Sequence, residues 1–193
     1  MAKKSDYGMN RRTILIPLSQ MDQPNLVRFM ELIVEPREGK DKTFSQLRFW
    51  GLNSAINKAK QLISCLKHAP EPSVLHWVNP NPNISGFDGI ALGLAIGSYA
   101  MNQPNGYRKI FSLGKLTADN ILIGNGYIEQ ALSALSVLPP QNNVSRCLIM
   151  PLLIKTSPKI RDLLGRIQSL GIDVYPVATL DQAMHIALVA HHG

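Results

Sequence analysis

Hydrophobic positions follow two different periods along this chain, and the period distinguishes predicted strands from predicted helices. Short runs rich in β-branched and aromatic residues, some of them alternating with polar ones, are typical of β-strands, whereas apolar residues recurring every three or four positions indicate helices. The first pattern predicts strands at 13–17, 25–36, 73–78, 108–113, 120–123, 146–152 and 172–177. The second predicts helices at about 53–68, 89–101, 127–138, 157–171 and 179–190.

Residues at the ends of the last two predicted helices support this assignment. Ser157 is a good N-cap and is followed by Pro158, which suits the first helical position, and Gly171 suits the C-terminal end. Thr179 and Gln182 have the spacing of a capping box. Because strands and helices interleave throughout, we predict an α+β (mixed α/β) fold with one domain over 13–190, preceded by a flexible basic N-terminus over 1–12.

The net charge of +7 is concentrated in the first third of the chain. Residues 1–67 contain 12 Lys and Arg against 6 Asp and Glu, a balance of +6, which leaves +1 for the remainder. A basic segment can attract nucleic acid, anionic lipid or an acidic protein. Much of this charge falls near the terminus and in the "REGKDK" turn, which are also typical of solvated tails and hairpin tips.

Cysteine content and hydropathy indicate a cytoplasmic protein. Cys65 and Cys147 both fall within apolar patterns, so we expect two buried thiols rather than a disulfide framework. No charged-then-apolar leader opens the chain, and the longest apolar stretch, 90–100, is about half of the roughly 20 residues that a membrane span needs. We therefore expect no secretory signal and no membrane insertion.

The segment "SGFDGIALGLAIG" (85–97) places a glycine-containing turn directly before a small-residue apolar helix. Several enzymes present a nucleophile in this way, and the side chain at the bend is Asp88. The structural alternative is that Asp88 is the N-cap of the helix, or that Ser85 caps it and Asp88 lies in the first turn. Ser85 as a substitute nucleophile is a further alternative, but the sequence shows no base for it.

The order of these segments resembles the proteolytic domain of Lon proteases. The matching segments are "SGFDGIALGLAIG", "SLGKLTADNILIGNGYIEQALSAL", "CLIMPL" and "IDVYPVATLDQAMHIAL", with "NLVRFMELIVEPREGKDK" and "GLNSAINKAKQLISCL" in the first half. The resemblance covers about 13–190 and consists mainly of apolar and glycine positions. It implies the ribosomal protein S5 domain 2-like architecture in which that family is built.

The catalytic residues that the resemblance implies are missing from this sequence. Lon-type proteases use a serine nucleophile and a lysine base. The serine position reads Asp88, and the lysine position reads Ile128 or Tyr127, depending on a one-residue gap. No lysine occurs between 116 and 154, and the family's "TGE" glutamate position reads Lys115. The sequence therefore predicts a pseudo-protease that is not an enzyme.

Three functions follow from this interpretation. The favoured one is a catalytically inactive Lon-like domain that acts as a protein-binding adaptor or scaffold subunit of a larger bacterial assembly, with self-association among its contacts. The alternative is a nucleic-acid-binding scaffold that uses the basic N-terminal half, as the resemblance implies for dyad-lacking Lon-like domains of a bacterial recombination ATPase. A minor alternative is residual serine peptidase activity. We expect no cofactor and no metal, because the histidines and cysteines lack ligand spacing and no G-x-x-x-x-G-K-[ST] motif is present.

Overall fold

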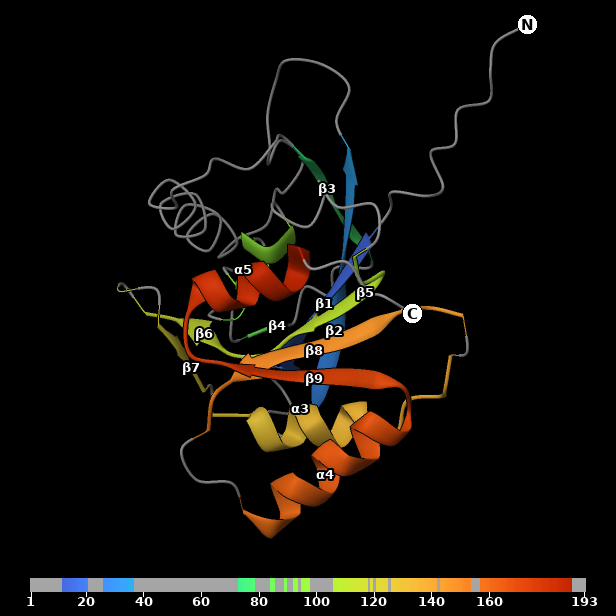
Figure 1. Cartoon of the computed structure of the whole chain (residues 1–193), viewed down its shortest axis with the longest axis vertical. Helices are drawn as coiled ribbons and strands as arrows, with labels where there is room; N and C mark the ends of the chain where they lie inside the picture. Colours follow the sequence, from blue (N-terminus) through green and yellow to red (C-terminus); the bar gives the residue numbers. More distant parts are fainter. Residues whose placement is uncertain are drawn as a thin grey trace, which may run out of the picture.

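The computed structural model shows a mixed β-sheet with helices on both of its faces (Figure 1). It describes residues 12–20, 26–36, 73–78, 84–85, 89, 92–93, 95–97, 106–117, 119, 121–124, 126–141, 143–153 and 157–188. The strands are β1 (Arg12–Gln20), β2 (Val27–Pro36), β3 (Ser73–Val78), β4 (Ile84–Ser85), β5 (Lys109–Ser112), β6 (Lys115–Leu116), β7 (Leu122–Ile123), β8 (Arg146–Pro151) and β9 (Ile172–Val177). The helices are α3 (Ile128–Leu135), α4 (Pro158–Ser169) and α5 (Leu180–Leu188), with a further helical segment at 92–97.

Seven of the strands form one sheet in the order β3-β2-β1-β5-β8-β9, with β4 paired to β1. The pairs β3–β2 and β2–β1 are antiparallel, whereas β1, β5, β8 and β9 run parallel to one another. The parallel half is built from two strand–helix–strand units, β5-α3-β8 and β8-α4-β9, which is the connection that adjacent parallel strands require. The mixed sheet confirms the predicted α+β fold class.

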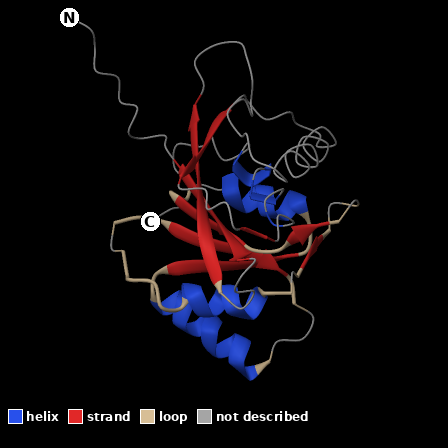
Figure 2. Cartoon of the chain, turned by 180° about the vertical axis from the view of Figure 1, so that it is seen from behind, coloured by secondary structure: helices blue, strands red, loops and turns tan. Residues whose placement is uncertain are grey.

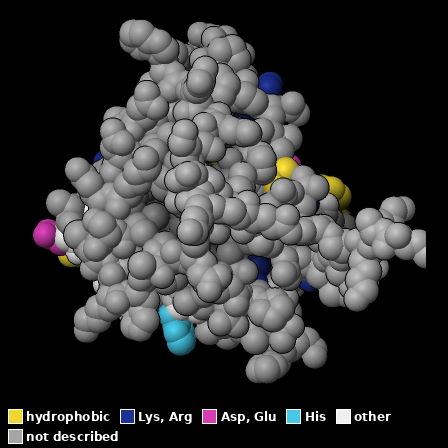
Figure 3. Space-filling view, turned by 90° about the horizontal axis from the view of Figure 1, so that it is seen from above, with side chains coloured by type: hydrophobic (Ala, Val, Ile, Leu, Met, Phe, Trp, Pro, Cys, Tyr) yellow, Lys and Arg dark blue, Asp and Glu magenta, His cyan; other side chains and the backbone are white. Residues whose placement is uncertain are grey.

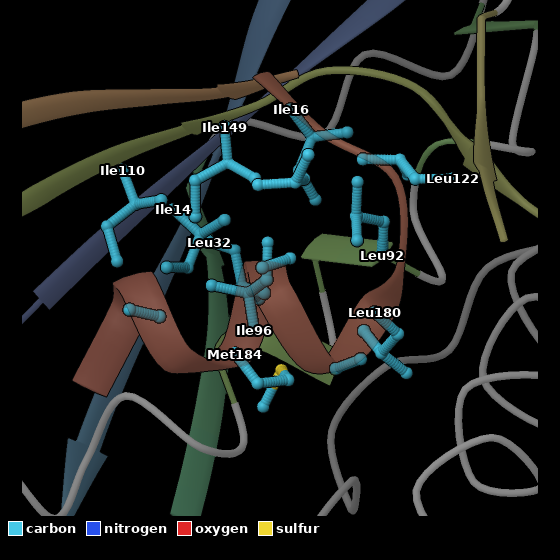
Figure 4. Close-up of a cluster of buried hydrophobic side chains, with 14 of the residues drawn as sticks. Ile14, Ile16, Leu32, Leu92, Ile96, Ile110, Leu122, Ile149, Leu180 and Met184 are labelled. Atoms are coloured by element: carbon cyan, nitrogen blue, oxygen red, sulfur yellow. The ribbon is translucent and has the colours of Figure 1, made fainter. Parts of the chain in front are cut away.

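Two hydrophobic clusters fill the two faces of this sheet, and both views of the chain show helices on either side of it (Figures 1 and 2). We call them the α5-side cluster and the α3/α4-side cluster. Ile14 and Ile16 of β1 belong to the first and Leu15 to the second, because successive side chains of a strand point to opposite faces. In Figure 4, side chains from the sheet, from 92–97 and from α5 point toward one another in the α5-side cluster.

The sequence-predicted ends of α4 are confirmed. The Ser157 Oγ accepts a hydrogen bond from the Ile160 N–H at 3.2 Å, and Pro158 is the first helical residue. Gly171 follows the helix with φ of +73°, a left-handed conformation that glycine adopts without penalty.

The cap of α5 differs in one detail from the predicted capping box. The Gln182 N–H donates to the Thr179 Oγ1 at 3.3 Å as expected. The Gln182 Oε1, however, accepts from the Ala178 N–H at 2.7 Å, one residue before the predicted partner. This shift occurs where Ile121 forms an antiparallel bridge with Thr179, next to the start of the helix.

Most predicted elements that fall within the described residues are present, with shifted ends. β1 begins at Arg12, which we had assigned to the flexible N-terminus but which is 2% exposed. The strand predicted at 120–123 is shorter, and the two-residue strands β4 and β6 were not predicted. The helix predicted at 53–68, as well as Cys65, lies outside the described residues, and the single domain over 13–190 stays a prediction.

Candidate functional site

Two segments that the resemblance aligns with catalytic residues lie close together in the fold: the residue after Asp88, and Tyr127 at the start of α3. Asp88 itself is outside the described residues, but Gly89, which follows it, is buried. A Cβ placed on Gly89 would lie 3.2 Å from the Gly114 carbonyl oxygen and 3.7 Å from the Tyr127 Oη. Gly89 is thus close to both the Gly114 turn and the residue that precedes α3.

Tyr127 is the member of the Ile128/Tyr127 pair whose hydroxyl lies near Gly89, 3.7 Å from where a Cβ on that glycine would be. It is the N-cap residue of α3, yet its side chain makes no capping hydrogen bond. Instead, the Tyr127 hydroxyl donates to the Pro17 carbonyl oxygen of β1 at 3.2 Å. The hydroxyl proton is therefore directed at the sheet, an arrangement suited to holding α3 in place rather than to accepting a proton.

Ile128 belongs to the hydrophobic core. It is 9% exposed and packs in the α3/α4-side cluster with Leu132 and Leu135. Its Cδ1 lies 2.8 Å from the point where a Cβ on Gly124 would be. A hydrocarbon side chain offers no lone pair, so Ile128 cannot act as a general base.

Gly114 forms the tight turn that connects β5 to β6 beside this site. Its φ is +118°, and a Cβ there would lie 2.7 Å from the Pro151 Cγ and 3.0 Å from the Ile123 carbonyl oxygen. Lys115, the residue at the family's glutamate position, is the first residue of β6 and pairs with Ile123. The described part of the site is therefore built of backbone turns and packed side chains.

Sequence reasoning missed a partly buried polar cluster on the α5 side of the sheet, in which Tyr107 is buried and Asp173 is exposed. The Tyr107 hydroxyl donates to the Asp173 Oδ2 at 2.7 Å and lies 2.5 Å from the Tyr175 hydroxyl. Burial, followed by the hydrogen bonds to Tyr175 and Asp173, raises the pKa of Tyr107 well above its usual value. Burial also raises the pKa of Cys147, so this thiol stays protonated and is a poor nucleophile.

Arg12 extends this cluster toward the C-terminal end of α5. Its Nη1 donates to the Ala187 carbonyl oxygen at 3.2 Å, and a cation is favourable at that end of a helix. Burial, with a contribution from the positive charge of Arg108, lowers the Arg12 pKa to about 10. Gly106 packs directly against the guanidinium, since a Cβ there would lie 2.7 Å from both Nη atoms.

A groove of about 250 Å³ opens on the α3/α4 side of the sheet, and sequence reasoning missed it as well. Its charged lining residues are Lys109, Arg146 and Glu31, and its apolar ones include Phe29 and Phe111. Lys109 and Arg146 are the first residues of β5 and β8 and pair with each other in the parallel register. The sequence does show a basic residue at the start of each of these two apolar strands. That pattern indicates a shared site only when the two strands are known to be neighbours in the sheet.

Figure 3 shows one face of the molecule, on which few described side chains are visible. In Figure 3, the described charged and hydrophobic side chains on that face form small separate areas, and no continuous basic area is visible among them. Within the described ranges, no three His, Cys, Asp or Glu side chains are grouped as metal ligands. Nor do these ranges contain a helix long and apolar enough to cross a membrane.

No family model matches the chain, and no curated protein matches it either.

Proposed function

We propose that this chain is a catalytically inactive domain similar to the Lon proteolytic domain and that it acts by binding other proteins, as an adaptor or scaffold subunit. The observation that carries the proposal is that the Tyr127 hydroxyl, which is hydrogen-bonded to Pro17, lies 3.7 Å from the position that a Cβ on Gly89 would occupy. The residues that the resemblance aligns with a nucleophile turn and a base thus lie in neighbouring segments. The side chains at the base position are a phenol engaged with the backbone and a core isoleucine.

The element order also supports the proposal. A hairpin, the small-residue helical segment 92–97, the β6–β7 pair, α3, and the β8-α4-β9-α5 series follow one another as the resemblance implies. With tyrosine and isoleucine in place of the lysine, this arrangement lacks the amine that activates the serine hydroxyl in a serine–lysine site.

A hydrolysis assay tests the absence of catalysis. We expect the purified chain to leave unfolded casein intact, at the same level as a Ser85→Ala variant. Turnover that the Ser85→Ala substitution abolishes would show that Ser85 is a nucleophile and would overturn the pseudo-protease assignment.

Restoring the two missing side chains tests the alignment itself. We expect an Asp88→Ser/Tyr127→Lys double variant to react with a fluorophosphonate probe for activated serines, because residue 127 is the one that lies beside Gly89. The matched Asp88→Ser/Ile128→Lys variant places its amine in the core cluster and should not react. Equal absence of labelling in two folded double variants would contradict the proposed correspondence with the serine–lysine site.

The binding role needs a separate measurement. Affinity purification of the tagged chain from its native cells should recover a stoichiometric protein partner, with gel filtration to detect self-association. Nucleic-acid binding, the alternative role, predicts a mobility shift that weakens steeply between two salt concentrations. A shift of that kind without a protein partner would replace the adaptor function with a nucleic-acid scaffold.

A further inference from the structure

The groove on the α3/α4 side lies at the starts of the parallel strands, at the opposite end from the turn at Gly114. The register places its lining in two rows across the sheet. Lys109 and Arg146 form one row, and Glu31, Leu15 and Phe111 form the next. Leu138 and the residues after it, which follow α3, form the wall. The site is thus built on strands in the interior of the sheet, which hold its side chains rigidly.

Arg146 introduces a fixed positive charge into this groove. It is 3% exposed, and its Nη1 and Nη2 donate to the Pro139 and Leu170 carbonyl oxygens. Its Nε is buried and has no hydrogen-bond partner among the described residues. A buried cation held by neutral carbonyls retains most of its attraction for an anion, because its charge is not neutralised.

Lys109 adds a second cation next to Arg146. The ion pair found among the described side chains joins Lys159 to Glu129, and neither Lys109 nor Arg146 forms one in that part of the chain. Glu31 is the one carboxylate among the groove's lining residues, so the lining has a net charge of one positive unit. This balance favours a monoanion over a polyanion such as nucleic acid.

The remaining lining is apolar and aromatic. Phe29 and Phe111 meet edge to face, with ring centroids 5.7 Å apart and an interplanar angle of 82°. Leu15 pairs with Phe111 in the sheet and is 6% exposed. A flat or branched hydrocarbon group would bury its surface on these side chains.

We infer that this groove binds a small carboxylate that carries one aromatic or branched apolar group, with the carboxylate on Lys109, beside the buried positive charge of Arg146, and the apolar group on Phe29 and Phe111. The groove is slightly smaller than the roughly 300–1,000 Å³ of drug-sized ligand pockets, which limits the ligand to about one ring and its acid. Such a group occurs as a free organic acid and as the last residue of a peptide. The inference is independent of the proposed adaptor function.

Phenylacetate is the probe for this site, and its amide is the matched neutral control. Isothermal titration at low salt should detect phenylacetate, and phenylacetamide should bind at least about tenfold more weakly because it lacks the charge. Raising the salt from about 0.05 to about 0.5 M should weaken the binding of the acid alone. Equal binding of the acid and the amide, or no binding of the acid at about 10 mM, would overturn the inference.

Two substitutions locate the binding in the groove. Lys109→Met should weaken phenylacetate binding by about five- to tenfold, whereas Glu31→Gln should strengthen it because it removes a like charge. A gain from Glu31→Gln is not expected from a merely structural role. Both side chains are only partly buried, so these variants should fold, which circular dichroism would confirm. An unchanged affinity in both folded variants would place the ligand elsewhere and refute the site.

A peptide arm identifies the source of the carboxylate. If the site binds the C-terminal residue of a peptide, Ala-Ala-Phe with a free C-terminus should bind at least as well as phenylacetate. Amidation of that C-terminus should abolish the binding. Weaker binding of the peptide would instead assign the site to a free acid. Failure of every acid would refute the groove but leave the casein and partner experiments unaffected.

Discussion

Replacement of Gly114 by alanine is the most direct test of the turn beside the candidate site. At φ of +118°, a residue with a Cβ is in a sparsely populated region, which costs about 1–3 kcal/mol. The added methyl group would also lie 2.7 Å from the Pro151 Cγ and 3.0 Å from the Ile123 carbonyl oxygen. The second of these neighbours is backbone that cannot rotate away, and overpacking of this kind costs about another 1–3 kcal/mol.

We therefore expect Gly114→Ala to lower the free energy of unfolding by about 4 kcal/mol, a large part of the 5–15 kcal/mol typical of a folded domain. For a chain of this length, the midpoint of thermal unfolding should fall by about 8–16 °C. Urea unfolding followed by circular dichroism measures the change directly, and an unchanged denaturant dependence would show that both end states are preserved.

Two other glycines provide matched controls for this substitution. Gly171 has φ of +73° but open space, since the nearest atom is the Arg146 Nη2 at 3.9 Å, so Gly171→Ala should destabilise by about 1–2 kcal/mol. Gly165 lies within α4 with nothing within 4 Å of an added Cβ, so Gly165→Ala should stabilise by about 0.5–1 kcal/mol. If Gly114→Ala behaves like either control, the tight packing of this turn against Pro151 is refuted.

Three further substitutions or reactions test the core and its buried polar groups. Leu132→Ala, at a fully buried position of α3, should cost about 2–5 kcal/mol in urea unfolding, and a change below about 1 kcal/mol would contradict its place in the core. In a Cys65→Ser background, Cys147 should not react with an aromatic disulfide reagent at neutral pH until the chain unfolds; prompt reaction of the folded chain would be inconsistent with its burial. Folding raises the pKa of Tyr107, so the contribution of this residue to stability is present below its unfolded pKa of about 10 and declines as the pH rises above that value. Tyr107→Phe should therefore reduce the loss of stability between about pH 9 and 11. The same slope in the two proteins would show that Tyr107 is not protonated preferentially in the fold.

The parts of the fold that were predicted correctly are those in which local and tertiary preferences agree. β8 reads as an uninterrupted apolar run because both of its faces are covered, with Cys147 on the α5 side and Leu148 on the other. α4 carries its own start and stop in Ser157 and Gly171. In such segments, hydrophobic period, capping and burial all require the same structure.

The elements that were missed depend on contacts between distant residues. β4 and β6 have two residues each, which is too short for any period, and they exist because β1 and β7 provide partners. The groove depends on the register that sets Lys109 beside Arg146, and no local pattern contains that register. The sequence also left Tyr127 and Ile128 as alternatives; in the fold the Tyr127 hydroxyl lies nearer to Gly89, whereas Ile128 is a core residue.

Side chains that lower the stability of a fold often occur at functional sites. The two ends of β5 and β8 differ in whether they carry such side chains. At the end near Gly89, the Tyr127 hydroxyl has an acceptor and Ile128 adds to the core, so both residues are compatible with a purely structural role. At the other end, Arg146 keeps a buried, unneutralised charge and an unpartnered Nε in the lining of a groove. The other described side chains with buried unpartnered atoms, Arg12 and Ser112, do not line it. Hydrogen bonds to two neutral carbonyls offset only part of the cost of burying the Arg146 charge, and an anion bound in the groove would offset more of it.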